Sequence, residues 1–154
     1  MNYKNKLYQY KNSIKLVVFG SSHICNTLYN IGLLNNKSTL DYHLPVIPDE
    51  FFNSFVRGYF DGDGCITIKK TGYSVTSICC NSKMFLTELK HKIQEFIPDL
   101  KSIRINVEYK NRKNPLYILY ITRKTDQNLF KNFIYNNSSI KLLRKYNKFM
   151  KIPC

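Results

Sequence analysis

The sequence lacks any run of about 18 consecutive apolar residues, the length that a membrane-spanning helix requires. This absence argues against a helical membrane protein. Residues 1–9 alternate lysine with asparagine and tyrosine, and they lack the apolar centre of a secretory signal peptide. We therefore expect a protein that is not secreted, has no membrane partner, and works in the cytoplasm, in an organelle such as a mitochondrion or plastid, or in a virus-infected cell.

The cysteines lack the spacing typical of a zinc site or of a disulfide-bonded scaffold. None belongs to a CxxC pair, no histidine lies at zinc-finger spacing, and an odd count of 5 fits no simple set of disulfides. The sequence thus argues against a zinc finger and a disulfide scaffold. We expect reduced, structural thiols at Cys25, Cys65, Cys79, Cys80 and Cys154.

Acidic residues are few: 10 Asp and Glu stand against 24 Lys and Arg, which gives a formal net charge of +14 over 154 residues. Because 44% of the residues are hydrophobic, the chain can bury a core, and disorder is not its expected state. A strongly basic domain favours a polyanion, and nucleic acid is the commonest one, since neutralised phosphates release counterions. An anionic membrane surface and a merely solvated surface are the alternatives.

Hydrophobic periodicity and turn residues predict an α+β fold. From residue 49 the expected order is αββαββα: a helix to about Phe60, strands 65–70 and 73–80, a helix 82–97, strands 103–109 and 116–122, and a helix 126–135 opened by Thr125 or Asp126. Before them, Ser13–Gly20 predicts a strand, and Ser21 or Ser22 is expected to cap a helix that ends at Gly32. A last basic helix is expected from Ser139 to Met150.

Two hairpins give an antiparallel sheet that must bury one face, and the amphipathic helices at 82–97 and 126–135 are expected to cover it. The other face is left open, and it is basic enough in part to lie along DNA. Side chains alternate between the two faces of a strand. The candidates for DNA contact on the open face are Thr67, Lys69, Asn106, Glu108 and Tyr120.

Residues 55–64 read Phe-Val-Arg-Gly-Tyr-Phe-Asp-Gly-Asp-Gly, an apolar helix that stops at two acids separated by glycine. A helix that is apolar on almost every side is expected to pack against a partner helix. Ser54, Gly58 and Gly62 recur at every fourth position and leave a groove in which another backbone can approach closely. We expect helix packing at these three residues.

The two acids predict a divalent cation. The last carbonyls of a helix carry partial negative charge, and Asp61 and Asp63 add full charges beside them. A hard cation such as Mg2+ relieves this repulsion, because it takes carboxylate and carbonyl oxygens and keeps positions for water and phosphate. A tight turn is the alternative for a bare Asp-Gly-Asp-Gly sequence, but the helix before it and the strand after it favour the cation site.

Residues 56–64 resemble the signature of the LAGLIDADG homing endonucleases in their dodecapeptide, or DOD-type, branch. The resemblance extends to about Phe149 and includes residues 20–25, 32–38 and 143–149. It implies two motif helices packed side by side, each αββαββα half laying its sheet into the DNA major groove. The implied activity is site-specific hydrolysis of double-stranded DNA with Mg2+ or Mn2+, in the service of intron or intein homing.

The resemblance also implies roles for single residues. By motif position, Asp63 matches the metal-binding acid, Gly62 the residue that offers its carbonyl to the metal, Asp61 the more structural acid, and Gly58 the helix-packing glycine. A basic residue is implied near the attacking water. Lys69, Lys83 and Lys124 are the candidates, and the expected catalytic set is Asp63, Asp61 and Lys124, with a phosphate contact as the alternative role of Lys124.

The sequence holds one such motif, whereas larger relatives hold two. Residues 1–44 look like the end of a preceding half, and residues 45–154 form the endonuclease-like domain. The chain would then pair with another copy as a homodimer, or it would be a split or shortened product that needs a second LAGLIDADG half. A non-cleaving nucleic-acid-binding protein on the same fold, such as a maturase or regulator, is the alternative function, and a protein that only assembles through the apolar helix is the third.

Overall fold

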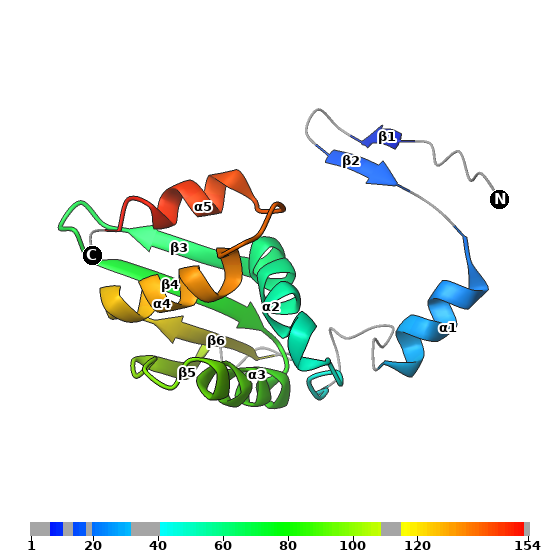
Figure 1. The fold of residues 1–154 in the computed structure, drawn as a ribbon, viewed down its shortest axis with the longest axis horizontal. Helices are drawn as coiled ribbons and strands as arrows, with labels where there is room; N and C mark the ends of the chain where they lie inside the picture. Colours follow the sequence, from blue (N-terminus) through cyan, green and yellow to red (C-terminus); the bar gives the residue numbers. More distant parts are fainter. Residues whose placement is uncertain (1–6, 11–13, 18–19, 32–40, 109–114, 153–154) are drawn as a thin grey trace. The chain divides into compact units, whose positions relative to one another are not determined.

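The computed structural model describes residues 7–10, 14–17, 20–31, 41–108 and 115–152 (Figure 1). They belong to two compact units, Met1–Leu33 and Leu34–Cys154. Residues 41–44, which the sequence analysis assigned to the first segment, therefore belong to the second unit. Cys154, residues 32–38 and most of the loop 111–115 lie outside the described residues. Among the described helices, none combines the length and the hydropathy needed to cross a membrane.

The described residues of the first unit form two short strands and a helix. β1 (Leu7–Tyr10) pairs antiparallel with β2 (Ile14–Val17), and α1 (Ser22–Asn30) follows. Ser21 caps α1 as expected, because its side chain accepts the Ile24 N–H at 3.2 Å. The strand β1 was not predicted from the sequence, since four residues are too few to show a clear alternation.

The second unit confirms the α+β class and the order αββαββα. Its elements are α2 (Asp49–Asp63), β3 (Gly64–Ile68), β4 (Ser74–Cys80), α3 (Lys83–Phe96), β5 (Ile103–Glu108), β6 (Leu116–Ile121) and α4 (Lys124–Tyr135), followed by α5 (Leu143–Phe149). The four strands form one antiparallel sheet in the order β3-β4-β6-β5. In the β3–β4 turn, Gly72 has a φ of 78°, a conformation that glycine adopts without strain.

The core lies between the sheet and helices α2, α3 and α4, which all lie on one side of it (Figure 1). The ring centroid of Phe60 in α2 lies 5.4 Å from that of Phe130 in α4 and 5.5 Å from that of Phe149 in α5. All three side chains are fully or almost fully buried. This cluster fixes the C-terminal half of α2, where the candidate site begins.

Three helix boundaries differ from the predictions. α2 does not stop near Phe60 but includes Asp61, Gly62 and Asp63 in its last turn. α5 begins at Leu143 rather than Ser139. The reason is a tertiary hydrogen bond: the backbone N–H of Leu142 donates to Oδ2 of Asp61 at 3.0 Å, so this segment is fixed by α2 instead of by its own helix.

The start of α4 also differs. Helix α4 begins at Lys124, and neither Thr125 nor Asp126 caps it. The buried carboxylate of Asp126 accepts the backbone N–H groups of Lys101 and Ser102 instead, at 3.0 and 2.5 Å. Asp126 thus joins α4 to the segment before β5, which local sequence could not reveal.

Candidate functional site

Helix α2 has a buried side and an open side. Phe52 and Val56 are fully buried, whereas Ser54, Gly58 and Gly62 are exposed. A Cβ atom added at Gly58 or Gly62 would meet no described atom within 4 Å. The stripe predicted for helix packing is therefore uncovered by the described part of the second unit.

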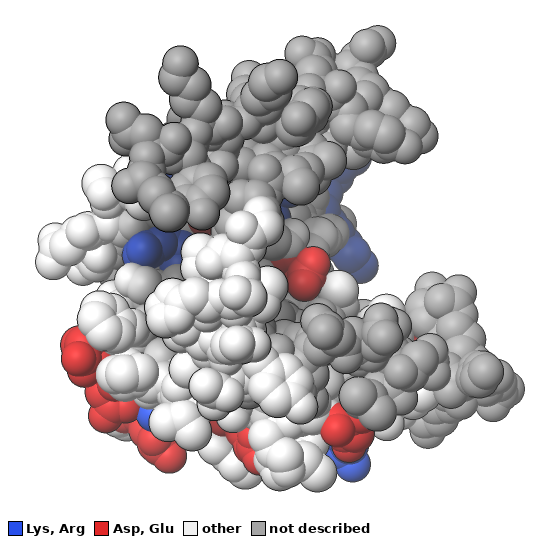
Figure 2. Space-filling view, turned by 90° about the vertical axis from the view of Figure 1, so that its right-hand side faces the viewer, with Lys and Arg blue, Asp and Glu red and all other residues white. Residues whose placement is uncertain are grey.

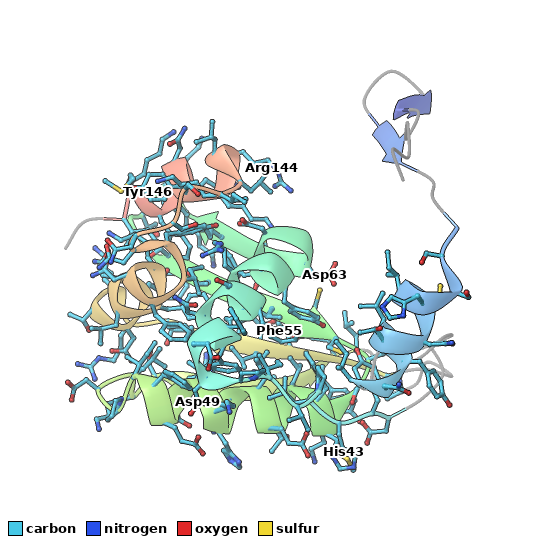
Figure 3. All side chains as sticks on the ribbon, turned by 45° about the vertical axis from the view of Figure 1, so that its right-hand side comes forward. His43, Asp49, Phe55, Asp63, Arg144 and Tyr146 are labelled. Carbon is cyan, nitrogen blue, oxygen red and sulfur yellow. The ribbon has the colours of Figure 1, made fainter. Side chains whose placement is uncertain are left out.

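Apolar side chains border this stripe of small residues. Phe51 is 59% exposed, which is unusual for a phenylalanine in a folded domain, and Phe55 is half-buried. Figure 3 labels Phe55 midway along α2 and Asp63 at its C-terminal end. An exposed apolar stripe that leads to a charged end is a surface suited to another helix.

Each oxygen of the Asp61 carboxylate accepts a hydrogen bond within the protein. Its Oδ1 accepts the hydroxyl of Tyr135 at 2.5 Å, and its Oδ2 accepts the backbone N–H of Leu142 at 3.0 Å. Burial raises the pKa of Tyr135, and the hydrogen bond to Asp61 raises it further, so the phenol remains a neutral donor. Asp61 therefore holds α2 against α4 and the start of α5.

A buried lysine caps the C-terminal end of α2. Lys145 of α5 is 3% exposed, and its Nζ donates to the backbone oxygens of Phe60, Asp61 and Gly62 at 2.6, 2.9 and 3.3 Å. Three acceptors match the three N–H donors of an ammonium, whereas a neutral amine has two. Burial lowers the pKa of Lys145, as does the neighbouring Arg144, while Asp61 and Asp63 oppose this shift.

Lys145 supplies, at the negative end of α2, a positive charge that the sequence led us to expect from a metal ion. Its ammonium also bonds the Gly62 carbonyl, which was the predicted metal ligand. Lys145 was not predicted from the sequence, because the only local signal is one lysine among several in a basic segment.

Asp63 is the acid that remains available. It is exposed at the last position of α2, and its carboxylate accepts no hydrogen bond from the described residues. Its backbone oxygen accepts the thiol of Cys79 at 3.6 Å. Burial raises the pKa of the Cys79 thiol, and the negative charge of Asp63 raises it further.

The site fits magnesium only as part of a larger set of ligands. Mg2+ in proteins is held through one or two carboxylates together with waters and substrate phosphates, and one exposed carboxylate matches that pattern. The described residues contain no cluster of three or more His, Cys, Asp and Glu side chains suited to a metal. Asp63 would therefore need phosphate oxygens, a second acid from a partner, or both.

The strand register separates the three candidate lysines. β4 runs antiparallel to β3, so Lys83, which follows β4, lies at the same end of the sheet as Asp63. Lys69 follows β3 and Lys124 follows β6, both at the opposite end. At about 3.3 Å per strand residue, Lys69 lies roughly 20 Å from Asp63, and Lys124 lies beyond the same far end of the sheet, two strands away. The structure thus does not bring Lys124 and Asp63 together within one chain.

The open face of the sheet carries four of the five residues predicted to contact DNA. Thr67 on β3, Tyr120 on β6, and Asn106 and Glu108 on β5 share this face in the observed register. The hydroxyl of Tyr120 donates to Oε1 of Glu108 at 3.4 Å. Lys69 lies just beyond the end of β3.

One further basic residue on this face was not predicted. Arg104 lies directly opposite Tyr120 on the neighbouring strand and is exposed. Alternation along strand 103–109 would have placed Arg104 on the same face as Asn106, so the signal was present in the sequence. The open face therefore carries a guanidinium on its edge strand β5.

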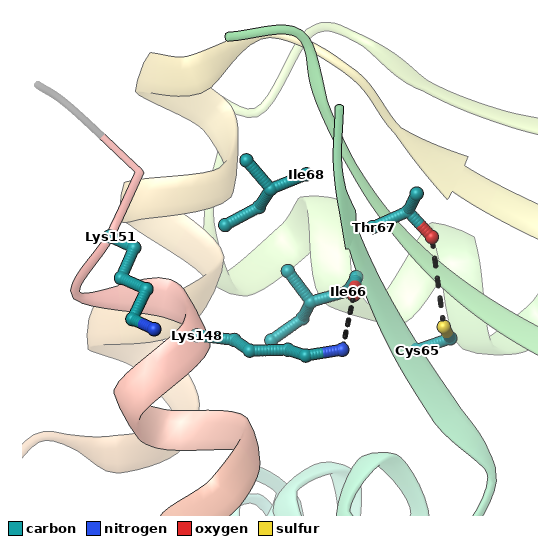
Figure 4. A pocket seen from close by; sticks show the side chains of 6 residues that line it. All are labelled: Cys65, Ile66, Thr67, Ile68, Lys148 and Lys151. Atoms are coloured by element: carbon teal, nitrogen blue, oxygen red, sulfur yellow. Dashed lines mark hydrogen bonds between the residues drawn. The ribbon is translucent and has the colours of Figure 1, made fainter. Parts of the chain in front are cut away.

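A groove runs along the outer edge of β3 (Figure 4). It has a volume of about 380 Å³ and is lined by residues 65–68 of β3 and by Lys148 and Lys151. The Nζ of Lys148 donates to the backbone oxygen of Ile66 at 3.2 Å, as expected at an edge strand with unpaired carbonyls. The groove places two ammonium groups beside one border of the open face.

The segment around α5 carries positive charge only. Residues 139–151, which include α5, contain five Lys and Arg and no Asp or Glu. Helix α3, by contrast, mixes Glu88 and Glu95 with three lysines. In the face shown in Figure 2, acidic side chains are visible along the lower edge. The α5 segment thus presents positive charge without opposing acids, and this charge attracts a polyanion.

Two comparisons of the sequence with known proteins give a match. The profile of the LAGLIDADG-like domain matches residues 50–147, which extend from α2 into α5. The chain is 30% identical over 115 residues to a probable translation initiation factor IF-2 of Methanocaldococcus jannaschii, a match that covers 71% of this chain and 10% of that protein. The chain thus spans about a tenth of the length of this curated relative.

A search of solved structures finds an archaeal intron-encoded homing endonuclease complexed with DNA. The match has a TM-score of 0.44 and 15% sequence identity, and it covers 67% of this chain and 65% of that one. The residues matched by the family profile, 50–147, include both Asp61 and Asp63 at the end of α2.

Proposed function

Since the chain belongs to the LAGLIDADG-like domain family, we propose that it is a homing-type endonuclease that hydrolyses double-stranded DNA with Mg2+ or Mn2+. The observation that carries this proposal is the state of Asp63. Its carboxylate is exposed and has no partner among the described residues, whereas the other acid at this helix end, Asp61, accepts a hydrogen bond at each oxygen. An acid left unpaired beside an uncovered helix stripe fits metal binding better than a structural role.

We assign a different task to each residue at the end of α2. Asp63 would hold the divalent cation, and Asp61 would position the helix end through Tyr135. Lys83, which shares the Asp63 end of the sheet, is the proposed basic residue near the attacking water. When bound, the cation supplies polarisation of the scissile phosphate.

The open face of the sheet is the proposed DNA-binding surface. Thr67, Asn106 and Tyr120 offer donors and acceptors suited to base edges in the major groove. Arg104 adds a cation on the edge strand β5 of this face. Lys69 and Lys124 lie at the far end of the strands, where we assign them to phosphate contacts, which position DNA without reading its sequence.

The groove beside β3 extends this surface. Lys148 and Lys151 would contact backbone phosphates that pass along the edge of the sheet. Their charges belong to the segment without acidic residues, so nothing on that segment opposes the approach of DNA. The contacts made there would raise affinity for all sequences.

A second LAGLIDADG helix is the proposed partner of the α2 stripe. Small side chains at Ser54, Gly58 and Gly62 allow close approach, and Phe51 supplies apolar area at the margin. A second copy would bring a second Asp63 beside the first, which supplies the acid that one chain lacks. A separate second half would serve the same purpose.

The test uses the purified protein and duplex DNA that spans the insertion site of its gene. We expect cutting in Mg2+, no cutting in EDTA, and loss of cutting with retained binding in Asp63→Asn. Asp99→Asn, at an exposed acid outside the site, is the matched control and should cut normally. Salt-sensitive binding without cutting in any divalent metal would favour the maturase or regulator alternative, and absence of binding would favour an assembly protein.

A further inference from the structure

We propose that Lys145 is a positioning residue whose ammonium keeps divalent cations from the end of α2 until a phosphate is present. This inference rests on the proposed function for the role of Asp63 as the metal-binding acid. It adds a regulation of that site: metal loading that depends on bound DNA.

The ammonium is fixed in place. Lys145 is 3% exposed, its Nζ donates to three successive carbonyls of the last turn of α2, and it lies 5.2 Å from the centroid of the Phe60 ring. A surface lysine could swing away and would be screened by salt. A buried one is screened much less, so its charge acts on the helix end at all times.

The charge lies close to where the metal would bind. The Gly62 oxygen is 3.3 Å from Nζ, and Mg2+ binds oxygen at about 2.1 Å, so a cation on this carbonyl would lie within about 5.4 Å of the ammonium. Even with the dielectric constant of water, repulsion between charges of +2 and +1 at that distance weakens binding about tenfold.

Asp63 is the acid that can reach an arriving cation, because both oxygens of Asp61 accept hydrogen bonds from Tyr135 and Leu142. The charge of Asp61 still acts at the helix end, where it opposes the charge of Lys145. With the ammonium in place, the two acids attract a divalent ion less strongly than they would without it. A DNA phosphate adds further negative charge, and we therefore expect metal and DNA to bind the site together.

The experiment is a titration of the full chain with Mn2+ in the absence of DNA, followed by electron paramagnetic resonance. Lys145→Gln keeps two N–H donors for the carbonyls and removes the charge. We expect it to bind Mn2+ about tenfold more tightly than the wild type, and we expect Asp63→Asn in the same chain to abolish the gain. Lys101→Gln removes one charge at an exposed position outside the proposed site and should stay within about twofold of the wild type.

A folded Lys145→Gln protein, checked by circular dichroism, that binds Mn2+ no more tightly than the wild type would overturn the proposal and leave Lys145 a helix cap. Wild-type protein that binds Mn2+ with a submillimolar Kd without DNA would overturn it as well, whether or not the variant folds. Neither measurement involves cutting, so these outcomes are distinct from a failure of the proposed nuclease function, which the DNA-cleavage test detects.

Discussion

The hydroxyl of Tyr135 and the carboxylate of Asp61 are joined by a hydrogen bond of 2.5 Å across 74 residues of sequence. The bond connects the end of α4 to the end of α2. Because both partners are removed from full solvent contact, it holds the helix end that carries Asp63 in one orientation. The two acids of the motif are thus divided between a structural task and a proposed metal-binding task.

Replacing Tyr135 by phenylalanine should lower the free energy of unfolding by about 1–3 kcal/mol, since Asp61 loses one of its two donors while partly buried. Urea unfolding followed by circular dichroism measures the change. Tyr146→Phe is the matched control, because the Tyr146 ring packs on Tyr135 at 5.4 Å without contacting Asp61. Equal effects of the two substitutions would contradict the importance of the Asp61 bond.

Amide substitutions of the two acids should have unequal effects on stability. Asp61→Asn should destabilise the protein, because its carboxylate accepts two hydrogen bonds. Asp63→Asn should change the stability less, since the repulsion that it relieves at the end of α2 is offset by the attraction to the Lys145 ammonium that it loses. Thermal unfolding of both variants tests this. An Asp63→Asn protein destabilised as much as Asp61→Asn would show that Asp63 has a structural partner.

Gly58→Leu should prevent association of α2 with a partner helix while leaving the single chain folded. The position is open in the described structure, and replacing a mid-helix glycine adds up to about 1 kcal/mol of helix stability. Sedimentation with and without duplex DNA measures the assembly. Asn132→Leu, an exposed site on α4, is the control. A Gly58→Leu protein that still forms the wild-type assembly would exclude this stripe as the interface.

Acid should loosen the segment 41–44 from α3. Burial raises the pKa of Glu88, but hydrogen bonds from the Leu44 N–H at 2.7 Å and the His43 ring at 2.6 Å outweigh it and hold the pKa below its ordinary value. The stabilisation is therefore present above the pKa of the unfolded chain, about 4.3, and is lost as the pH falls through the lower folded value.

Unfolding midpoints between pH 7 and pH 3 check this expectation. The wild type should lose stability over the acidic part of that range, and Glu88→Gln should lose less, because it has already given up the carboxylate. Glu95→Gln, at an exposed glutamate on the same helix, should follow the wild-type curve. Identical curves for Glu88→Gln and the wild type would show that protonation of Glu88 does not cause the loss of stability in acid.

Alanine at Lys148 or Lys151 should weaken DNA binding for all sequences alike and reduce the salt dependence of the affinity by about one counterion per lysine. Fluorescence anisotropy with two unrelated duplexes at several salt concentrations gives both quantities. Lys90→Ala is the control, since α3 covers the other face of the sheet. An unchanged salt slope would place the groove outside the DNA interface.

Much of the second unit followed from local sequence. Helix α3 shows this best: Ser82 caps it through the Phe85 N–H at 3.0 Å, and the apolar residues that recur along it are buried, Phe85, Leu89 and Ile93 among them. A helix cap and a hydrophobic period involve residues within one or two turns of each other. The face of the sheet on which each strand side chain lies could also be predicted, because the alternation of side chains is a local property of a strand.

The ends of several helices, and which residues come together at the site, could not be predicted from local sequence. Lys124 and Asp63 were placed together by motif expectation, and the strand register separates them. Lys145 was one basic residue among several until packing brought it to Phe60, 85 residues earlier in the chain.

The sequence by itself determined which residues form helices and strands, which faces they bury, and that two acids follow an apolar helix. Tertiary structure alone decided which acid stays available, since the partners of Asp61 and the ammonium at the end of α2 come from the last two helices. The physical reason is the separation along the chain of the groups that interact. Periodicity and capping act between neighbours along the chain, whereas the charge around Asp63 depends on groups that meet only when distant segments pack.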